Sequence, residues 1–414
     1  MNTSISAPDT ARSGASADPL LQGLAAGPLY VDRRCYTDPR IFALEQRDIF
    51  AHTWQFIAHD SELKQAGDFR TTELAGEPVI AIRGADGQLR LFLNTCRHKG
   101  TLLVDAPAGQ CEKMKCPYHH WTYDTQGGLI SVPKVEAYGD RFHFAENGLV
   151  PVARFDVHAG MWFGCLDPDA PPLVEYLGPA APHLAEIGAY AGQELVALGA
   201  YRYSYDANWK LLMENTLDDY HAEYLHDYAF TQRAALFQME GTSGFQEKEG
   251  SRFSLDLGIH GAFDQCDDIR TLTIQTLRER RLYLGIFPSF IALYNPVWDV
   301  TSFRVIEPVS VDKTNVLTYC LAPRSATEEQ RRAIGERFHY SWGPGGRAGV
   351  DDIVVFSRVQ KGLQARAGGR INIGRGIDRT DPQGGPADDH AVRALWKGWR
   401  QYMGVDEAAG APTC

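Results

Sequence analysis

The spacing of hydrophobic positions divides the chain into a β-rich first part and a mixed second part. The segment 40–60 carries Ile41, Leu44 and Ile49 at roughly helical spacing, which predicts a helix that leads into a strand. Short alternating segments follow, and Asp86 and Gly87 between two of them favour a hairpin turn. The strands expected in this part are 69–74, 78–83, 89–94, 121–123 and 160–166. These patterns predict a small β domain.

The second part of the chain combines strands with helices. Thr327 followed by Gln330 forms a capping-box pattern, which predicts a helix that runs to about Tyr340. The segment 391–403 has the pattern of an amphipathic terminal helix. The alternating segments expected to form one antiparallel sheet are 282–286, 290–294, 300–307 and 315–321. The chain as a whole is therefore expected to be an α+β protein.

The domain boundaries are expected where regular patterns stop. A stretch rich in Asp and Pro at 167–172 interrupts regular structure and is the best linker candidate. The first 27 residues are rich in Ser, Ala, Asp and Pro, without the basic start and apolar core of a signal peptide. We expect a flexible tail over 1–27, a first domain with its N-terminal helix over 28–170, and a second domain over 171–414.

Composition narrows the class of protein. The chain has 414 residues, of which 44 % are hydrophobic and 22 % charged, as in ordinary globular proteins. A formal net charge of −11 argues against nucleic acid or an anionic membrane surface as a partner. No run of apolar residues is long enough to predict a transmembrane helix. The eight dispersed cysteines suggest reduced thiols in the cytoplasm and no disulfide framework.

Two mixed Cys/His pairs are the strongest chemical signal. Cys96 and His98 form the first pair, and Cys116 and His119 form the second after seventeen intervening residues. Two thiolates on one iron and two imidazoles on the other are the ligands of a Rieske [2Fe–2S] centre. A single tetrahedral zinc ion can take the same four atoms, although zinc ligands usually come as Cys-Cys or His-His pairs. The mixed pairs favour the Rieske cluster over zinc.

A second metal site is indicated in the segment 208–226, which reads as a helix with Asn208 as its N-cap. Asp218 and His221 are three positions apart and share one face of a helix. His221 and His226 are five positions apart, which turns their side chains away from each other on a straight α-helix. Both can face one metal ion only if the helix bends or contains a π-bulge.

The two loops, CRHKG and CPYHHW, resemble the Rieske domain of the large (α) subunit of Rieske non-haem iron aromatic-ring-hydroxylating oxygenases. The resemblance extends over 30–405, and it implies a helix-grip catalytic domain after the Rieske domain. It also implies an Fe(II) ion held by two histidines and one carboxylate from a later helix. In this sequence those residues are His221, His226 and Asp352, with Asp351 as the fallback for the carboxylate.

The resemblance implies further roles. Asp218 is similar to the carboxylate that links a histidine of the catalytic iron to a Rieske histidine, here His119, of the adjacent subunit. Asn215 resembles a position near the iron. The sequence has no GxGxxG in a βαβ context, so NADH oxidation is expected in a separate reductase, with or without a ferredoxin. A homotrimer or an α3β3 assembly with a small β subunit is expected, because the electron path needs a neighbour.

The expected reaction is O2-dependent hydroxylation or dihydroxylation of an aromatic ring, with an aromatic carboxylate as the expected substrate. Arg304 lies on a predicted strand, where it could bind a substrate carboxylate or form a surface salt bridge. Phe230, Phe287 and Tyr294 could line the pocket or fill the core. Two alternatives stay open at this point: a Rieske monooxygenase that removes O- or N-methyl groups, and a Rieske electron carrier without oxygen chemistry.

Overall fold

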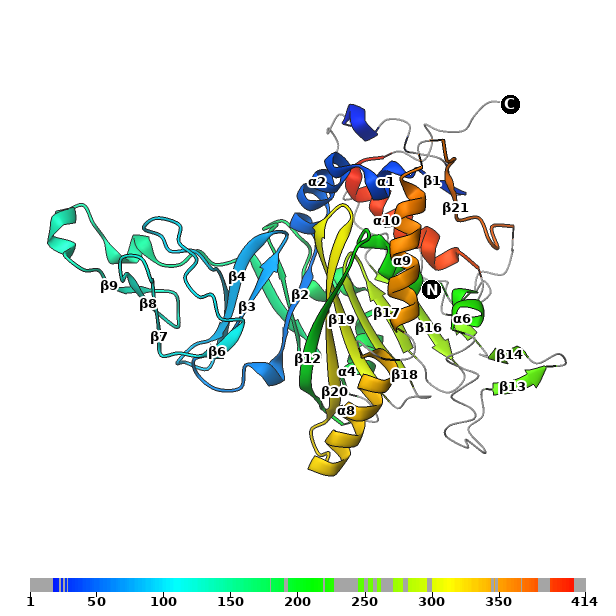
Figure 1. Ribbon diagram of the computed structural model, residues 1–414. Coiled ribbons are helices and arrows are strands. Elements are labelled where there is room, and N and C mark those ends of the chain that lie inside the picture. Colours follow the sequence, from blue (N-terminus) through cyan, green and yellow to red (C-terminus); the bar gives the residue numbers. More distant parts are fainter. Residues whose placement is uncertain are drawn as a thin grey trace, which may run out of the picture.

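The computed structural model describes most of the chain between residues 18 and 405 (Figure 1). The described residues are 18–21, 24, 27, 29–178, 180–189, 193–218, 220–226, 245–248, 252–255, 259–261, 271–277, 282–295, 300–343, 346, 349–365, 367–378 and 388–405. Most of the tail expected over 1–27, and Phe230, lie outside these residues. Among the helices described, none has both the length and the apolar character needed to cross a membrane.

The first unit is built from three small antiparallel sheets. A four-stranded sheet has the order β5-β4-β3-β6, and two three-stranded sheets have the orders β7-β8-β9 and β10-β11-β2. The strands are β2 (Gln55–His59), β3 (Asp68–Leu74), β4 (Glu77–Arg83), β5 (Leu89–Leu93), β6 (Ala108–Gln110), β7 (Lys113–Lys115), β8 (Thr122–Asp124), β9 (Leu129–Ser131), β10 (Arg154–His158) and β11 (Met161–Cys165). The five strands expected from the sequence in this part all form, within a few residues of their predicted ends.

The second unit is organised around one seven-stranded antiparallel sheet of order β12-β20-β19-β18-β17-β16-β15. Its strands are β12 (Leu195–Tyr205), β15 (Ile259–Gly261), β16 (Thr271–Leu277), β17 (Leu282–Ile286), β18 (Phe290–Asn295), β19 (Val300–Ser310) and β20 (Lys313–Pro323). The four predicted strands form its central part. The shorter pairs outside it are β1 (Tyr30–Val31) with β21 (Ile371–Asn372), and β13 (Phe245–Lys248) with β14 (Arg252–Leu255).

Helices complete both units. The α-helices are α1 (Arg34–Thr37), α2 (Pro39–Asp48), α3 (Leu173–Leu177), α4 (Ala180–Gly188), α5 (Lys210–Thr216), α6 (Tyr220–Leu225), α8 (Glu328–Trp342), α9 (Gly349–Leu363) and α10 (His390–Met403). Short 3-10 helices span Pro19–Leu21, Phe50–His52, Asp60–Glu62, Val135–Tyr138 and Phe144–Asn147. The capping box predicted at Thr327 and Gln330 opens α8, with both reciprocal hydrogen bonds present.

The seven-stranded sheet is covered on both faces. Successive residues of β18 alternate between two hydrophobic cores, because side chains of a strand point alternately to opposite faces. Ile291 and Leu293 join the core beneath α5, α9 and α10. Phe290 and Ala292 join the core shared with α3, α4 and the sheet β10-β11-β2. The sheet therefore connects the helices of one face to the first unit on the other.

Aromatic rings join the two units rigidly. Phe56 of β2 stacks on Phe290 of β18, with ring centroids 4.9 Å apart and an interplanar angle of 8°. Phe163 of β11 meets the same ring edge-on at 5.5 Å. The linker candidate at 167–172 also contacts the first unit, because the Trp54 indole donates a hydrogen bond of 2.9 Å to the carbonyl of Pro171. These contacts form one packed interface between the units.

The N-terminal helices pack differently from the division expected at residue 170. Tyr36 of α1 and Ile41 and Leu44 of α2 belong to the same hydrophobic core as Trp209 and Trp396. Their side chains are thus buried among helices of the second unit, although the chain then enters the first unit through β2. We propose that this N-terminal segment belongs structurally to the second unit.

A buried polar network lies between these helices. Lys210 and Glu45 are both fully buried, and the Lys210 ammonium donates to Glu45 Oε1 at 2.5 Å. Close by, Glu214 accepts hydrogen bonds from the Tyr36 hydroxyl at 2.7 Å and from the Trp396 indole at 2.9 Å. Burial raises the pKa of Glu214 to about 7, although these two hydrogen bonds oppose the shift. Glu214 is therefore a buried acid that titrates near neutral pH.

This pKa predicts a pH dependence of stability. Between about pH 4.5 and 7 the folded protein holds a proton on Glu214 that the unfolded chain has released, so stability falls as pH rises through this window. The loss amounts to about 3 kcal/mol above pH 7. Glu214→Gln keeps an acceptor oxygen but cannot ionise. Thermal melting at pH 5 and pH 8.5 should show a smaller decrease for Glu214→Gln than for the wild type.

The control for this prediction is Glu336→Gln, which removes an exposed acid paired with Arg332 on α8. Its melting temperature should follow the wild type at both pH values, because exposed ion pairs contribute little. An unchanged pH dependence in Glu214→Gln would contradict the assignment.

Candidate functional site

The first Cys/His pair lies on a tight loop after β5. The Cys96 backbone N–H donates to the Thr101 carbonyl at 2.8 Å, and the Gly100 N–H donates back to the Cys96 carbonyl at 2.9 Å. Gly100 has φ of 69°, a conformation that glycine adopts without steric cost. The loop therefore closes on itself through backbone hydrogen bonds.

The second pair lies on a loop of the same backbone pattern. The Cys116 N–H donates to the Trp121 carbonyl at 2.8 Å, and the His120 N–H donates to the Cys116 carbonyl at 3.1 Å. His120 occupies the place that Gly100 has in the first loop, and its φ is 62°. The repeated geometry explains why two histidines stand side by side in the sequence: His120 closes the turn, and His119 is the metal-ligand candidate.

The four predicted cluster ligands come together at the ends of these loops. Cys96 and Cys116 are both buried and both free of disulfides. The rings of His98 and His119 lie edge-to-face with centroids 4.5 Å apart. His98 Nε2 lies 3.3 Å from the Tyr138 hydroxyl, while His98 Nδ1 is buried and has no hydrogen-bond partner among the described residues. A buried nitrogen without a partner fits a metal ligand.

One residue of this site had no signal in the sequence. The Tyr123 hydroxyl lies 3.3 Å from Cys96 Sγ and accepts a hydrogen bond of 3.0 Å from the Arg97 N–H. Tyr123 is fully buried on β8. In the sequence, a tyrosine within a short strand is most simply interpreted as a core residue. The contact of its hydroxyl with the Cys96 sulfur becomes visible only in the folded structure, where β8 packs against the first loop.

The second candidate site is formed where the predicted metal helix is interrupted. The segment 208–226 forms two short helices, α5 and α6, and not one bent or π-bulged helix. Asp218 Oδ1 accepts the Tyr220 N–H at 2.7 Å, a capping bond that starts α6 anew. His226 follows the end of α6, so its direction is not set by helical rotation. The rings of His221 and His226 approach with centroids 5.3 Å apart.

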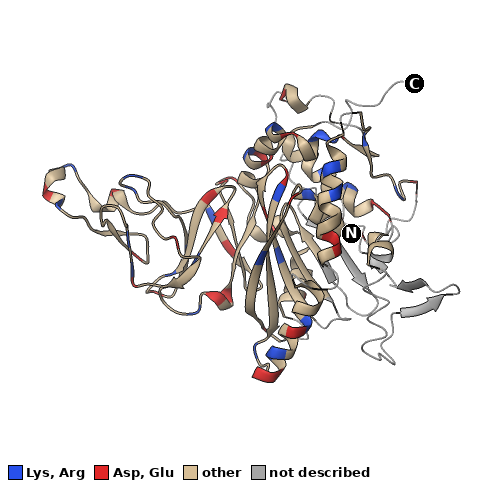
Figure 2. Ribbon diagram, in the orientation of Figure 1, with Lys and Arg blue, Asp and Glu red and all other residues tan. Residues whose placement is uncertain are grey.

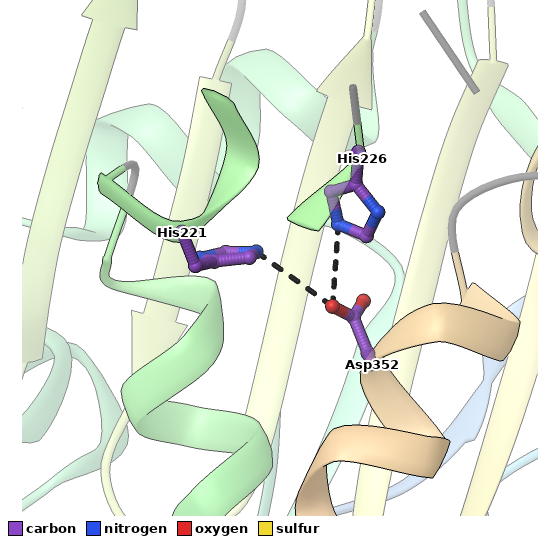
Figure 3. Close-up of side chains that lie close together, drawn as sticks. All are labelled: His221, His226 and Asp352. Carbon is purple, nitrogen blue, oxygen red and sulfur yellow. Dashed lines mark ion pairs between the residues drawn. The ribbon is translucent and has the colours of Figure 1, made fainter. Parts of the chain in front are cut away.

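Asp352 completes this site from the first turn of α9. Its Oδ1 lies 3.2 Å from His226 Nε2 and 3.7 Å from His221 Nε2 (Figure 3). The three potential ligand atoms lie within 4.8 Å of one another. Asn215 Nδ2 donates to the same oxygen of Asp352 at 3.2 Å. Among the described residues this is the one group of three or more that gathers its ligand atoms so tightly.

The distances between ligand atoms also distinguish the kinds of metal centre that the two sites can hold. A single zinc ion holds all its ligand atoms at about 2.0–2.3 Å and so keeps them within about 4 Å of one another. The Cys/His quartet on the two loops does not converge in that way within the described part of the chain. A cluster of two irons, with sulfur ligands on one and nitrogen ligands on the other, fits the quartet better.

Two further carboxylates lie behind the histidines. Asp218 Oδ2 is 3.5 Å from His221 Nδ1, and Asp351 Oδ2 is 3.6 Å from His226 Nδ1. Of the two candidate acids on α9, Asp352 therefore faces the histidine pair and Asp351 does not; Figure 2 shows this acidic start of α9. Burial would lower the pKa of His221, but the carboxylates of Asp218 and Asp352 outweigh burial and raise it.

A small cavity lies beside the triad. This cavity is lined by Asp352 of α9, Arg304 of β19, Trp342 of α8, and Tyr201 and Tyr203 of β12. Two imidazole nitrogens and one carboxylate oxygen on one side of a metal ion leave its other positions open for small molecules. The cavity and the triad thus share Asp352.

Arg304 lies in this cavity and not on the surface. Its side chain is buried, and its guanidinium carbon lies 4.3 Å from the centroid of the Trp342 ring. No carboxylate lies within ion-pair distance of Arg304 among the residues that the structure describes. Phe287 is fully buried in the core and stacks on Tyr402, and neither Phe287 nor Tyr294 lines the cavity.

Comparison with known proteins agrees with this architecture. The Rieske [2Fe–2S] domain family matches residues 53–153, and the catalytic domain of the ring-hydroxylating α subunits matches residues 193–404. The α subunit of toluate 1,2-dioxygenase from Pseudomonas putida is 30 % identical over 366 residues, covering 82 % of this chain and 80 % of that protein. The α subunit of 2-aminobenzenesulfonate 2,3-dioxygenase from Alcaligenes sp. is 30 % identical over 387 residues, covering 90 % and 93 %.

Solved structures share the fold. Naphthalene 1,2-dioxygenase from Rhodococcus sp. superposes with a TM-score of 0.75 at 22 % identity, covering 90 % of this chain and 94 % of that one. The quaternary ammonium Rieske monooxygenase CntA superposes with a TM-score of 0.70 at 22 % identity, covering 91 % and 96 %. The catalytic-domain match excludes a simple electron carrier.

Members of this family carry a Rieske [2Fe–2S] cluster and a mononuclear non-haem iron, and the donor sets found in this structure fit both groups. The chain therefore belongs to the large (α) subunits of the Rieske non-haem iron aromatic-ring-hydroxylating oxygenases.

Proposed function

We propose that this protein is the terminal oxygenase of a multicomponent system that dihydroxylates an aromatic ring bearing a carboxylate. The observation that carries this proposal is Arg304, a buried cation without an acidic partner in the described structure, in the cavity that also contains Asp352. Electrons from NADH are expected to arrive through a separate reductase, with or without a ferredoxin.

The energetics of Arg304 favour an anionic substrate. A buried charge without a partner is costly, and a bound carboxylate would offset that cost through two parallel hydrogen bonds. The Trp342 ring packs against the guanidinium, a contact that a planar guanidinium can make while it also donates hydrogen bonds in its own plane. The names of the relatives that act on toluate and 2-aminobenzenesulfonate describe ring-bound anions, which supports the proposal. The likeness to CntA concerns the fold alone.

We propose Cys96 and Cys116 as ligands of one cluster iron, and His98 and His119 as ligands of the other. Tyr123 would then donate a hydrogen bond to the sulfur of Cys96. A hydrogen bond to a cluster sulfur stabilises the reduced state, which carries more negative charge.

We propose His221, His226 and Asp352 as the ligands of the catalytic iron. Iron in such a site supplies the activation of O2 on its open positions. The role of the protein chain is to bind and orient the aromatic ring of the substrate. Arg304 binds the substrate carboxylate, and Asn215 restrains the Asp352 oxygen. The aromatic side chains that line the cavity exclude water from the substrate ring.

Electrons are proposed to pass between copies of the chain through Asp218. Strands β7 and β8, which the second Cys/His loop joins, lie at the end of the first unit away from the seven-stranded sheet (Figure 1). The triad comes from α6, the residue after α6, and α9 of the second unit. The packed aromatic joint between the units, with Phe56 on Phe290, opposes a hinge that would bring the ends together. We therefore propose a homotrimer, or an α3β3 assembly with a small β subunit, in which Asp218 contacts His119 of a neighbouring copy.

Tyr123→Phe is predicted to lower the reduction potential of the cluster. Loss of one hydrogen bond of about 1 kcal/mol corresponds to about 40 mV for a one-electron couple. A redox titration followed by electron paramagnetic resonance measures this potential. Tyr118→Phe is the control, since Tyr118 packs on His119 without a hydrogen bond to sulfur. An unchanged potential in Tyr123→Phe would show that the hydroxyl does not tune the cluster.

Mixed assemblies test the electron path. Cys116→Ala removes the cluster from one chain, and His226→Ala removes the iron from another. If electrons pass between neighbours in a cyclic trimer, each mixed assembly keeps one intact cluster that faces one intact iron site of the next chain. The wild type has three such pairs, so the mixed assembly should have roughly one third of its rate. Co-expression with two affinity tags, purification on both, and measurement of product formation give this rate. Transfer within a chain predicts no activity in any mixture.

Arg304→Gln tests the substrate class. With benzoate, kcat/KM should fall about a hundredfold, because a charged hydrogen-bonding partner worth roughly 3 kcal/mol is lost. With toluene, which has the same ring and no charge, kcat/KM should not fall. Arg202→Gln is the matched control, since Arg202 lies on β12 in an exposed pair with Glu307. A similar loss for both substrates would contradict a carboxylate site at Arg304.

A further inference from the structure

Each histidine of the proposed iron triad has a carboxylate at its outer nitrogen. For His221 this carboxylate is Asp218, at 3.5 Å from Nδ1, and it lies three residues earlier on the same segment. For His226 it is Asp351, at 3.6 Å from Nδ1, and it comes from α9. The role expected for Asp218 is the electron path between subunits. Asp351 has no such role, and its position calls for another explanation.

Asp351 and Asp352 contact opposite edges of one ring. Asp352 Oδ1 lies 3.2 Å from Nε2 of His226, and Asp351 Oδ2 lies 3.6 Å from its Nδ1. Consecutive residues of an α-helix point about 100° apart, so neighbouring side chains of α9 can reach around the imidazole from two sides. This geometry excludes Asp351 as a ligand on the Nε2 side, where Asp352 already stands.

His221 and His226 are placed differently along the chain. His221 is part of α6, whose backbone limits its rotamers, whereas His226 follows the last residue of that helix. An imidazole that binds a metal through Nε2 carries its proton on Nδ1, and a hydrogen bond from that N–H fixes both the tautomer and the ring direction. The present separation is that of an ion pair, and a small rotation of the Asp351 side chain would shorten it to a hydrogen bond.

Asp351 reaches the ring from a partly exposed position. It lies in the first turn of α9, and its side chain is 43 % exposed, whereas that of His226 is 6 % exposed. The carboxylate therefore approaches the buried ring from the solvent side, at the Nδ1 edge.

We propose that Asp351 is the positioning residue of His226, which accepts the Nδ1 hydrogen bond and holds Nε2 toward the metal position. The inference rests on the proposed iron triad. Asp351 acts through His226 and touches neither metal nor substrate. This positioning role replaces the expectation from the sequence that Asp351 could take the place of Asp352 as the iron ligand.

The test is Fe(II) affinity of the full-length assembly, measured by competition with a chelator after reconstitution. Asp351→Ala removes the acceptor and should weaken Fe(II) binding tenfold to a hundredfold, the range typical for partners that orient ligands. Asp351→Glu keeps an acceptor carboxylate and should restore most of the affinity. The absorption spectrum of the Rieske cluster and the melting temperature of the iron-free protein should stay unchanged in both variants.

Two controls separate this role from others. Glu329→Gln removes an acid from the first turn of α8 that has no histidine partner, and Fe(II) affinity should be unaffected. Asp352→Ala should abolish Fe(II) binding. If Asp351→Ala also abolishes it, Asp351 is a ligand and the inference is wrong; if Asp351→Ala binds Fe(II) normally, the carboxylate positions nothing. Failure of the wild type to bind Fe(II), with its cluster intact, would instead overturn the proposed triad and the inference with it.

Discussion

The catalytic half of this protein depends on one buried contact between α9 and the residues just before α5, segments that are distant in the sequence. The Gln360 side chain on α9 accepts the Asn208 backbone N–H at 3.1 Å and donates to the Tyr36 carbonyl at 3.0 Å. An amide left without partners inside a protein is costly, so this contact specifies the register between the helices. About two turns further along, the same register brings Asn215 to Asp352.

The buried ion pair of Glu45 and Lys210 further restricts how these helices can pack. Glu45 accepts hydrogen bonds from Lys210 and from the indoles of Trp209 and Trp399, so the network joins α2 to the start of α5 and to α10. Such a pair adds little stability compared with apolar side chains, but loss of one partner leaves an uncompensated buried charge. The network therefore contributes to specificity, because one packing of α2, α5 and α10 satisfies all of its donors.

The two redox sites follow different structural rules. The cluster loops are local: each closes on itself through backbone hydrogen bonds, and Gly100 and His120 take the same left-handed conformation. The iron site is assembled from separate segments, and it needs the break between α5 and α6 to turn His226 toward Asp352. A local site survives changes elsewhere in the fold, whereas an assembled site depends on the packing of every helix that contributes to it.

The sequence by itself determined the fold class, the central strands of both units, the helix that begins at the capping box of Thr327, and the two short Cys/His spacings, because these signals act within a few residues. The paired loops needed no distant contact to be recognised. The sequence could not decide how His221 and His226 turn toward each other: the spacing suggested a bend, and Asp218 instead starts a new helix.

Only the tertiary structure decided the rest. It brought Asp352 to the histidine pair and placed Asp351 behind it, a choice between two adjacent acids that depends on the rotation of α9. It also placed Arg304 in the cavity, since strand alternation allows two faces and packing selects one. The N-terminal helices pack into a core with helices of the second unit, and the sequence pattern of these helices does not specify that partner. These features arise from contacts between residues that lie far apart in the sequence.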